Sequence, residues 1–387
     1  MPTRMIPAKF DDIRPYYPHE VAEAMQRVAD SPELAAAARF VFPGEETESV
    51  RRMIRSIGSA EEFQDKVMSR AIERIVGSSM TGFTYEGLGH VVAGQGRLFV
   101  SNHRDIMLDA SLLQYVLHAH GLETTDITFG DNLMYPGFVT DVGRSNKMFK
   151  VVRGANIKEF LSHSKLLSEY MRMAVAELSH SVWIAQRNGR TKDGRDATDQ
   201  GLVKMFGMSG DGDLAESFAR LNITPVAISY QYEPCDMFKV QELFASRGGR
   251  KYVKAPGEDL RSIVTGIMQP KGMVHMAVCR PIGLSELEPL RMLERNEFYR
   301  ALASLIDRRI FAAYRLFDTN YAAHDIRSGE NRWSDRYSPQ FREEFEAYAE
   351  GIISRLDGER ETLRDILLGI YANPVDNCAG SASARLD

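Results

Sequence analysis

The middle of the chain alternates short apolar runs with longer amphipathic stretches. β-Branched and aromatic residues gather in five short runs, at residues 97–101, 127–130, 181–185, 223–229 and 273–278. Apolar residues at helical spacing lie between the early runs, at about residues 106–120 and 157–179. Short apolar strands that alternate with helices are typical of an α/β sheet covered by helices on both faces.

Both ends of the chain show helical periodicity instead. Ser59 and Glu62 form a capping-box pattern ahead of an apolar stripe that runs to about residue 75. Further stripes occupy residues 298–310 and 341–356. We therefore predict three parts, which are an N-terminal helical domain (1–84), an α/β domain (85–285) and a C-terminal helical extension (286–387).

One stretch inside the α/β domain has no clear period. Residues 230–263 contain several glycines, a proline and a basic run, which fit regular structure poorly. We expect a long excursion there with a flexible basic tip at residues 247–254.

Composition narrows the class of protein. The chain has 387 residues, of which 44% are hydrophobic, and a net charge of −5. That apolar fraction supports a substantial core, and the lack of a basic excess argues against nucleic-acid binding. The cysteines, Cys235, Cys279 and Cys378, are too far apart for a disulfide framework or a four-cysteine zinc site, which favours a reducing compartment.

No apolar run reaches the roughly 18 residues of a membrane span, and no signal peptide is evident. We expect a cytoplasmic protein whose membrane contact is peripheral.

The most informative motif follows the first apolar run of the α/β region. Residues 101–110 read Ser-Asn-His-Arg-Asp-Ile-Met-Leu-Asp-Ala and connect a strand pattern to a helix pattern. His103 is a candidate general base, because the ordinary pKa of imidazole is close to neutral pH. Either Asp105 or Asp109 would orient its ring while a substrate hydroxyl acts as the nucleophile. Alternatively, Asp105 caps the following helix and His103 packs in the loop.

A kinase or a metal site fits this motif poorly. His-Arg-Asp also opens the catalytic loop of protein kinases, but Ala110 stands where that loop has asparagine, and no other kinase motif accompanies it. No further cluster of His, Asp or Glu has ligand spacing, so we expect no metal. Transfer to a substrate hydroxyl needs only a base and charge stabilisation, so we expect no cofactor either.

A second candidate site is the turn after the run at 181–185. Gln186, Arg187, Gly189 and Arg190 belong to a basic segment punctuated by glycine, which suits an anion held by guanidinium groups and backbone amides. Arg153, in the sequence Phe-Lys-Val-Val-Arg, is a further candidate cation. A solvated basic loop would have the same composition.

The order of these motifs resembles the glycerolipid acyltransferase family. Asn102-His103 with Asp109, then Phe149 with Arg153, then the Gly189-Arg190 turn, and finally Thr-Pro-Val-Ala-Ile at residues 224–228 follow the order of that family's sequence blocks. The resemblance covers about residues 95–285. It implies a mixed sheet flanked by helices, with His103 as the base and Asp109 as its partner.

The resemblance also implies substrates and binding residues. The family, which includes lysophosphatidate and glycerol-3-phosphate acyltransferases, moves an acyl group from acyl carrier protein or coenzyme A to the acceptor hydroxyl in phospholipid biosynthesis. By the same likeness, the acceptor and donor would be bound by the following residues: Asn102, Arg153, Gln186, Arg187, Gly189, Arg190 and Pro225. A lysolipid acceptor implies peripheral association with the inner face of the cell membrane, through the N-terminal helices or the tip at residues 247–254.

Two departures from the family pattern keep alternatives open. Five residues separate His103 from Asp109, one more than in the family, so Asp105 remains a candidate partner. Gln186-Arg187 stands where the family usually has Glu-Gly. The alternatives are an acyltransferase for an amino-acid-headed lysolipid, or a member that binds lipid or acyl carrier protein without turnover.

Overall fold

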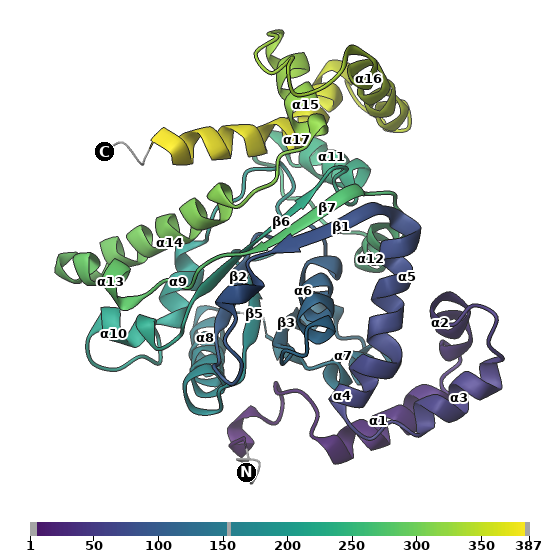
Figure 1. Ribbon diagram of the computed structural model, residues 1–387, viewed down its shortest axis with the longest axis vertical. Coiled ribbons are helices and arrows are strands. Elements are labelled where there is room, and N and C mark those ends of the chain that lie inside the picture. The colour runs from purple at the N-terminus through teal and green to yellow at the C-terminus, as the bar shows by residue number, and fades with distance from the viewer. Residues whose placement is uncertain (1–5, 153–155, 384–387) are drawn as a thin grey trace.

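The computed structural model describes residues 6–152 and 156–383 and is built around a seven-stranded mixed sheet (Figure 1). The strand order is β1-β7-β6-β2-β5-β3-β4. Only the β6–β7 pair is antiparallel, so β2 to β6 all run in one direction and β1 and β7 in the other. The α/β class and the mixed sheet are therefore as predicted. The strands are β1 (Met80–Glu86), β2 (Leu98–Ser101), β3 (Asp126–Gly130), β4 (Met148–Val151), β5 (Val182–Ala185), β6 (Thr224–Tyr230) and β7 (Gly272–Val278).

Five of these strands coincide with the apolar runs of the sequence, whereas β1 and β4 have no such run. β1 is partly exposed along most of its length, so its sequence lacks a buried strand's continuous apolar pattern. β4 is a four-residue edge strand that pairs with β3 alone. β1 also crosses the predicted domain boundary at residues 84/85, and the division into three domains stays a prediction.

Alternate residues of the central strands face two separate cores. Leu98 and Val100 of β2 belong to one apolar cluster, and Phe99 between them belongs to the other. This alternation is the pleat of a strand buried on both faces. The first core is covered by α8 (Ile157–Arg172), α9 (Gln200–Phe206), α10 (Leu214–Ala219), α13 (Leu284–Leu287) and α14 (Arg295–Ala312). The second is covered by α5 (Ser69–Ser79), α6 (Leu108–Ala119) and α12 (Glu258–Met268).

Two further apolar clusters lie outside these layers, at opposite ends of the molecule in Figure 1. The N-terminal cluster is formed by α1 (Pro18–Asp30), α2 (Leu34–Val41), α3 (Thr47–Arg55) and α4 (Ala60–Phe63), with α7 (Phe138–Ser145) packed against it. The other cluster joins α11 (Asp236–Ala245) to α15 (Asp318–Ser328), α16 (Pro339–Ile353) and α17 (Arg360–Ser383). Short 3₁₀ turns lie at Ala8–Phe10, Leu88–His90, Asp131–Leu133, Arg247–Gly249 and Glu288–Met292, and π-helical turns at Gln64–Met68 and Met173–Glu177.

The expectation of an irregular excursion over residues 230–263 is wrong for much of that stretch. α11 lies within it and buries Val240 and Lys239 against its neighbours. The period of this short helix is weak because charged residues are buried in it as ion pairs. The basic tip itself, at residues 247–254, forms only a short 3₁₀ turn, at Arg247–Gly249.

Candidate active site

The candidate site lies where three adjacent parallel strands end. β6, β2 and β5 are neighbours in the sheet, so the loops that follow them leave from the same edge. These loops carry the His103 motif, the basic turn and the start of α11. In an open α/β sheet this edge is where ligands usually bind.

His103 and Asp109 form a hydrogen-bonded pair. His103 Nδ1 lies 2.8 Å from Asp109 Oδ2, and both side chains are largely buried. Because the carboxylate accepts, Nδ1 carries the proton and Nε2 presents its lone pair. The ring edge of Trp183 packs against His103, with the ring centroids 5.8 Å apart. The imidazole is therefore held in the tautomer of a general base.

Further donors fix the Asp109 carboxylate. Its Oδ2 also accepts from the backbone N–H groups of Arg104 (2.6 Å) and Asp105 (3.0 Å), and its Oδ1 accepts from the Tyr230 hydroxyl (2.7 Å). Burial, together with this carboxylate, holds the pKa of Tyr230 well above its ordinary value, so the hydroxyl remains a donor. The carboxylate is a rigid partner for the ring.

Asp105 is not the partner of His103, although the spacing of the motif permits it. Its Oδ1 accepts from the backbone N–H groups of Met107 and Leu108, both at 2.9 Å, so it caps the start of α6. Five residues separate His103 from Asp109, and with this spacing Asp109, rather than Asp105, reaches the ring of His103. Burial raises the pKa of Asp105, the nearby Asp109 carboxylate adds to this rise, and the Leu108 N–H and Arg190 partly oppose it.

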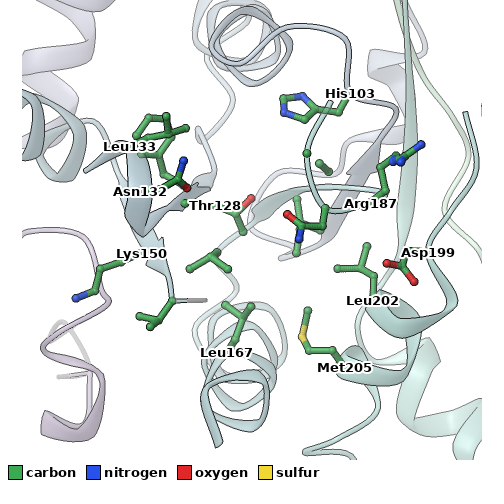
Figure 2. Close-up of a pocket in the computed structure, with 18 of the residues that line it drawn as sticks. His103, Thr128, Asn132, Leu133, Lys150, Leu167, Arg187, Asp199, Leu202 and Met205 are labelled. Atoms are coloured by element: carbon green, nitrogen blue, oxygen red, sulfur yellow. The ribbon is translucent and has the colours of Figure 1, made fainter. Parts of the chain in front are cut away.

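A cavity of about 520 Å³ opens beside His103, within the usual size range of ligand sites. Figure 2 shows His103, Arg187 and Asp199 at one side of it and Lys150 at the opposite side, with Leu167, Leu202 and Met205 along the wall between. The cavity therefore has a polar end next to the base and an apolar wall that leads away from it.

The basic turn lines the polar end. Arg187, Gly189 and Arg190 all border the cavity, and Gly189 has φ 75°, a left-handed conformation that glycine adopts without strain. Arg190 is only 9% exposed, and its Nη1 has no hydrogen-bond partner among the described residues. An unpaired buried donor is costly, and an anionic ligand oxygen would satisfy it. Lys192 instead pairs with Glu242.

Other predicted binding residues do not reach the cavity. Asn102 is buried, and its side chain bonds both backbone groups of Ile228, with its Oδ1 2.8 Å and its Nδ2 2.9 Å from them. Pro225 is buried within β6 beside Val100. Gln186 is fully buried, and its amide nitrogen and oxygen have no partner among the described residues. These three residues are therefore buried and do not line this cavity, and their contact with substrate stays a prediction. Arg153 lies outside the described residues.

The sequence motifs missed two residues that hold the pair. Tyr230 ends β6, one residue beyond the predicted run, and Trp183 lies inside a run whose pattern indicates only a strand. Trp183 lines the cavity, and its Nε1 donates to Ser101 Oγ at 3.0 Å. An aromatic residue at the end of a run is the signal for Tyr230, and an aromatic residue inside a run is the signal for Trp183. Neither identifies a contact with Asp109 or His103.

Two structural features bear on cofactors and membranes. Within residues 6–152 and 156–383, His, Cys, Asp and Glu side chains form no group of three that could hold a metal ion. Over the same ranges, every helix is too short or too polar to cross a bilayer.

Neither a protein-family model nor a curated protein matches this sequence. The fold is similar to the crystal structure of the 1-acyl-sn-glycerophosphate (LPA) acyltransferase PlsC from Thermotoga maritima, with a TM-score of 0.38 and 12% sequence identity. The match covers 76% of this chain and 95% of that chain. The chemistry of the site therefore has to follow from its own residues.

Proposed function

We propose that this protein is an acyltransferase that moves a fatty acyl group from a thioester of acyl carrier protein or coenzyme A to the hydroxyl of lysophosphatidate or glycerol 3-phosphate. The observation that carries the proposal is the His103–Asp109 pair at a cavity whose polar end also holds the buried, incompletely paired Arg190. A base, an anion-binding group and an apolar wall are what transfer of an acyl chain to an anionic acceptor requires. The order of the sequence motifs supports the same reaction.

The residues suggest the following mechanism. Nε2 of His103 takes the proton of the acceptor hydroxyl, and Asp109 stabilises the imidazolium that forms. The acceptor oxygen attacks the thioester carbonyl, the new C–O bond forms, and the C–S bond breaks. The leaving thiolate then takes the proton back from His103. Arg187 and Arg190 hold the acceptor's phosphate, and the apolar wall around Leu167, Leu202 and Met205 receives the acyl chain.

The acceptor and the occurrence of turnover are tested together. The purified protein is incubated with acyl carrier protein or coenzyme A thioesters and with lysophosphatidate, glycerol 3-phosphate or an amino-acid-headed lysolipid, and products are identified by mass spectrometry. We expect an acylated glycerol phosphate, with transfer lost in His103→Ala and retained in His118→Ala, a control at the far end of α6. Acylation of the amino-acid lipid alone would support the alternative acceptor. Thioester binding without any product would indicate a non-catalytic binder.

We further propose that the protein binds peripherally to the inner face of the cell membrane, with the cavity opening towards the lipid. Phe160 borders the cavity and is 57% exposed, and Ile157 on the same turn of α8 is 80% exposed. Val253, next to the cavity-lining Lys254 in the basic tip, is 79% exposed. Exposed apolar and basic side chains near one opening suit an anionic bilayer surface.

Vesicle flotation tests this orientation with a matched pair of variants. Ile157→Glu should weaken binding to anionic vesicles at low salt, because it places a charge at the proposed contact. Met292→Glu makes the same change at a 93% exposed apolar residue away from the cavity and should bind as the wild type does. Equal binding by all three proteins would contradict the proposed orientation.

A further inference from the structure

A buried cluster of charged side chains surrounds Arg104, the residue that follows His103. The Arg104 guanidinium bonds Asp196 (Nη2–Oδ2, 2.6 Å) and Glu233 (Nη1–Oε2, 3.2 Å), and Lys239 Nζ bonds Glu233 Oε1 at 2.5 Å. These four side chains are almost completely buried, and their two positive and two negative charges balance. Replacing such a buried set by apolar residues often leaves stability unchanged or raises it, so stability alone does not explain its presence.

The cluster joins the loops that form the candidate site. Arg104 follows β2, Asp196 lies beyond the basic turn that follows β5, and Glu233 follows β6. One guanidinium thus connects the loops at the ends of three adjacent parallel strands. A planar fork that reaches two carboxylates fixes their relative position more tightly than an ammonium group does.

The backbone next to the base is held by the same cluster. The Arg104 N–H donates to Asp109 Oδ2, and the Arg104 carbonyl accepts from Lys239 Nζ at 2.7 Å. The carbonyl of His103 accepts from the Thr191 N–H, next to Arg190, at 2.8 Å. The position of the base is therefore tied to the position of the anion-binding turn.

The helix α17 reaches this cluster through the Tyr371 hydroxyl, and Tyr314, in the segment after α14, also donates to Asp196 Oδ2. Tyr371 of α17 accepts from the Glu233 N–H (3.0 Å) and donates to Asp236 Oδ2 of α11 (2.7 Å). Tyr348 of α16 also donates to Asp236 Oδ2, at 2.5 Å, and does not contact that N–H. Two tyrosines thus share one carboxylate, and only one of them is linked to the cluster.

We propose that Arg104 is a positioning residue, which sets the distance between His103 and Arg190 through Asp196 and Glu233, and that Tyr371 makes α17 part of the same framework. This inference rests on the proposed acyl transfer. Transfer requires the base and the acceptor's anion site to be held at one fixed spacing, and a displacement of about 1 Å can cost about 100-fold in rate.

The first test replaces the Arg104 guanidinium by an ammonium group and keeps the positive charge. Arg104→Lys should lower kcat by about 10- to 100-fold, with a smaller change in the donor KM, because one ammonium cannot bond both carboxylates in the same geometry. Arg27→Lys is the control, since the guanidinium of Arg27 in α1 donates two hydrogen bonds, of 2.9 and 2.7 Å, to the single carboxylate of Asp141 in α7. It should retain the wild-type kcat. A folded Arg104→Lys variant with wild-type kcat and pH–rate profile would overturn the inference.

The second test applies even if Arg104→Lys does not fold. Tyr371→Phe and Tyr348→Phe each remove one donor to Asp236, but only the first leaves the Glu233 N–H without its partner. We expect Tyr371→Phe to lower kcat by about 2- to 30-fold and Tyr348→Phe to leave it unchanged. Equal kcat values in these two variants would overturn the link to α17. In the double variant with Arg104→Lys, the losses should be less than multiplicative.

A spectroscopic measurement separates this inference from the proposed function. Absence of transfer by the wild-type protein with every donor and acceptor would refute the proposed function. The Nδ1–H resonance of His103, assigned with His103→Ala, then decides the positioning role by NMR. We expect this resonance to move in Arg104→Lys and not in Arg27→Lys. An unchanged resonance in a folded Arg104→Lys variant would show that Arg104 does not position the ring.

Discussion

Asp109→Asn removes the charge beside His103 and leaves the geometry in place. Asp109 Oδ2 faces three N–H donors, from the His103 ring and from two backbone amides. An amide NH₂ cannot occupy that position, so the oxygen of the new asparagine must remain there. Its NH₂ then faces the Tyr230 hydroxyl, which is able to accept. His103 therefore keeps its tautomer, and the substitution reports the charge alone.

The size of the effect follows from the distance. Nδ1 and Oδ2 are 2.8 Å apart, which places the centres of the two charges at about 4 Å once the imidazolium forms. At an effective dielectric constant of about 20, the attraction is about 4 kcal/mol, or about 10³-fold in rate. Because the hydrogen bond itself remains, we expect a fall in kcat of about 10²- to 10³-fold.

Asp105→Asn is the matched control. Its Oδ1 would keep both backbone N–H bonds at the start of α6, and the buried negative charge would disappear. Because burial raises the pKa of Asp105, its ionised form costs stability in the folded state, so a neutral Asn should not lower stability at pH 8. We expect kcat within about threefold of wild type, or about 0.7 kcal/mol. Steady-state kinetics and thermal melts of both variants decide the matter, and a larger loss in Asp105→Asn would refute the assignment of Asp109.

Four other substitutions test separate parts of the structure. Arg190→Lys should lower the acceptor kcat/KM by about 10- to 150-fold by losing a charge-assisted bond of about 1.5–3 kcal/mol, while the donor KM stays unchanged. Kinetics with each substrate varied in turn measure this, and an unchanged acceptor value would remove the anion-binding role. Gly266→Ala places a Cβ 2.0 Å from Asp105 Oδ2 and should lower the free energy of unfolding in urea by about 1–3 kcal/mol. Gly351→Ala, a helical glycine facing open space, should instead raise it by about 0.5–1 kcal/mol. Burial raises the pKa of Asp307 to about 6, so its ionised form costs about 3 kcal/mol once the pH exceeds 6 and nothing below about pH 4. Asp307→Asn should therefore stabilise the protein by up to about 3 kcal/mol at pH 8 and little at pH 4, and equal gains at both would contradict this reasoning.

The sequence by itself predicts the strands that are buried on both faces of the sheet. The five apolar runs became β2, β3, β5, β6 and β7 because a strand enclosed by two helical layers needs apolar residues throughout. The His103 motif could also be located, since a polar loop between a buried strand and a helix stands out locally. β1 and α11 were missed because their exposed or ion-paired residues hide the period.

Only the tertiary structure decided which carboxylate serves His103. The loop contains both Asp105 and Asp109, and their spacing alone permits either. The choice depends on backbone amides of the loop and on Tyr230, which is distant in the sequence and adjacent in the fold. The same holds for Arg104, whose partners Asp196 and Glu233 come from two other strand ends. Local patterns determine strands and helices because these depend on near neighbours, whereas a buried polar contact depends on which segments the sheet order brings together.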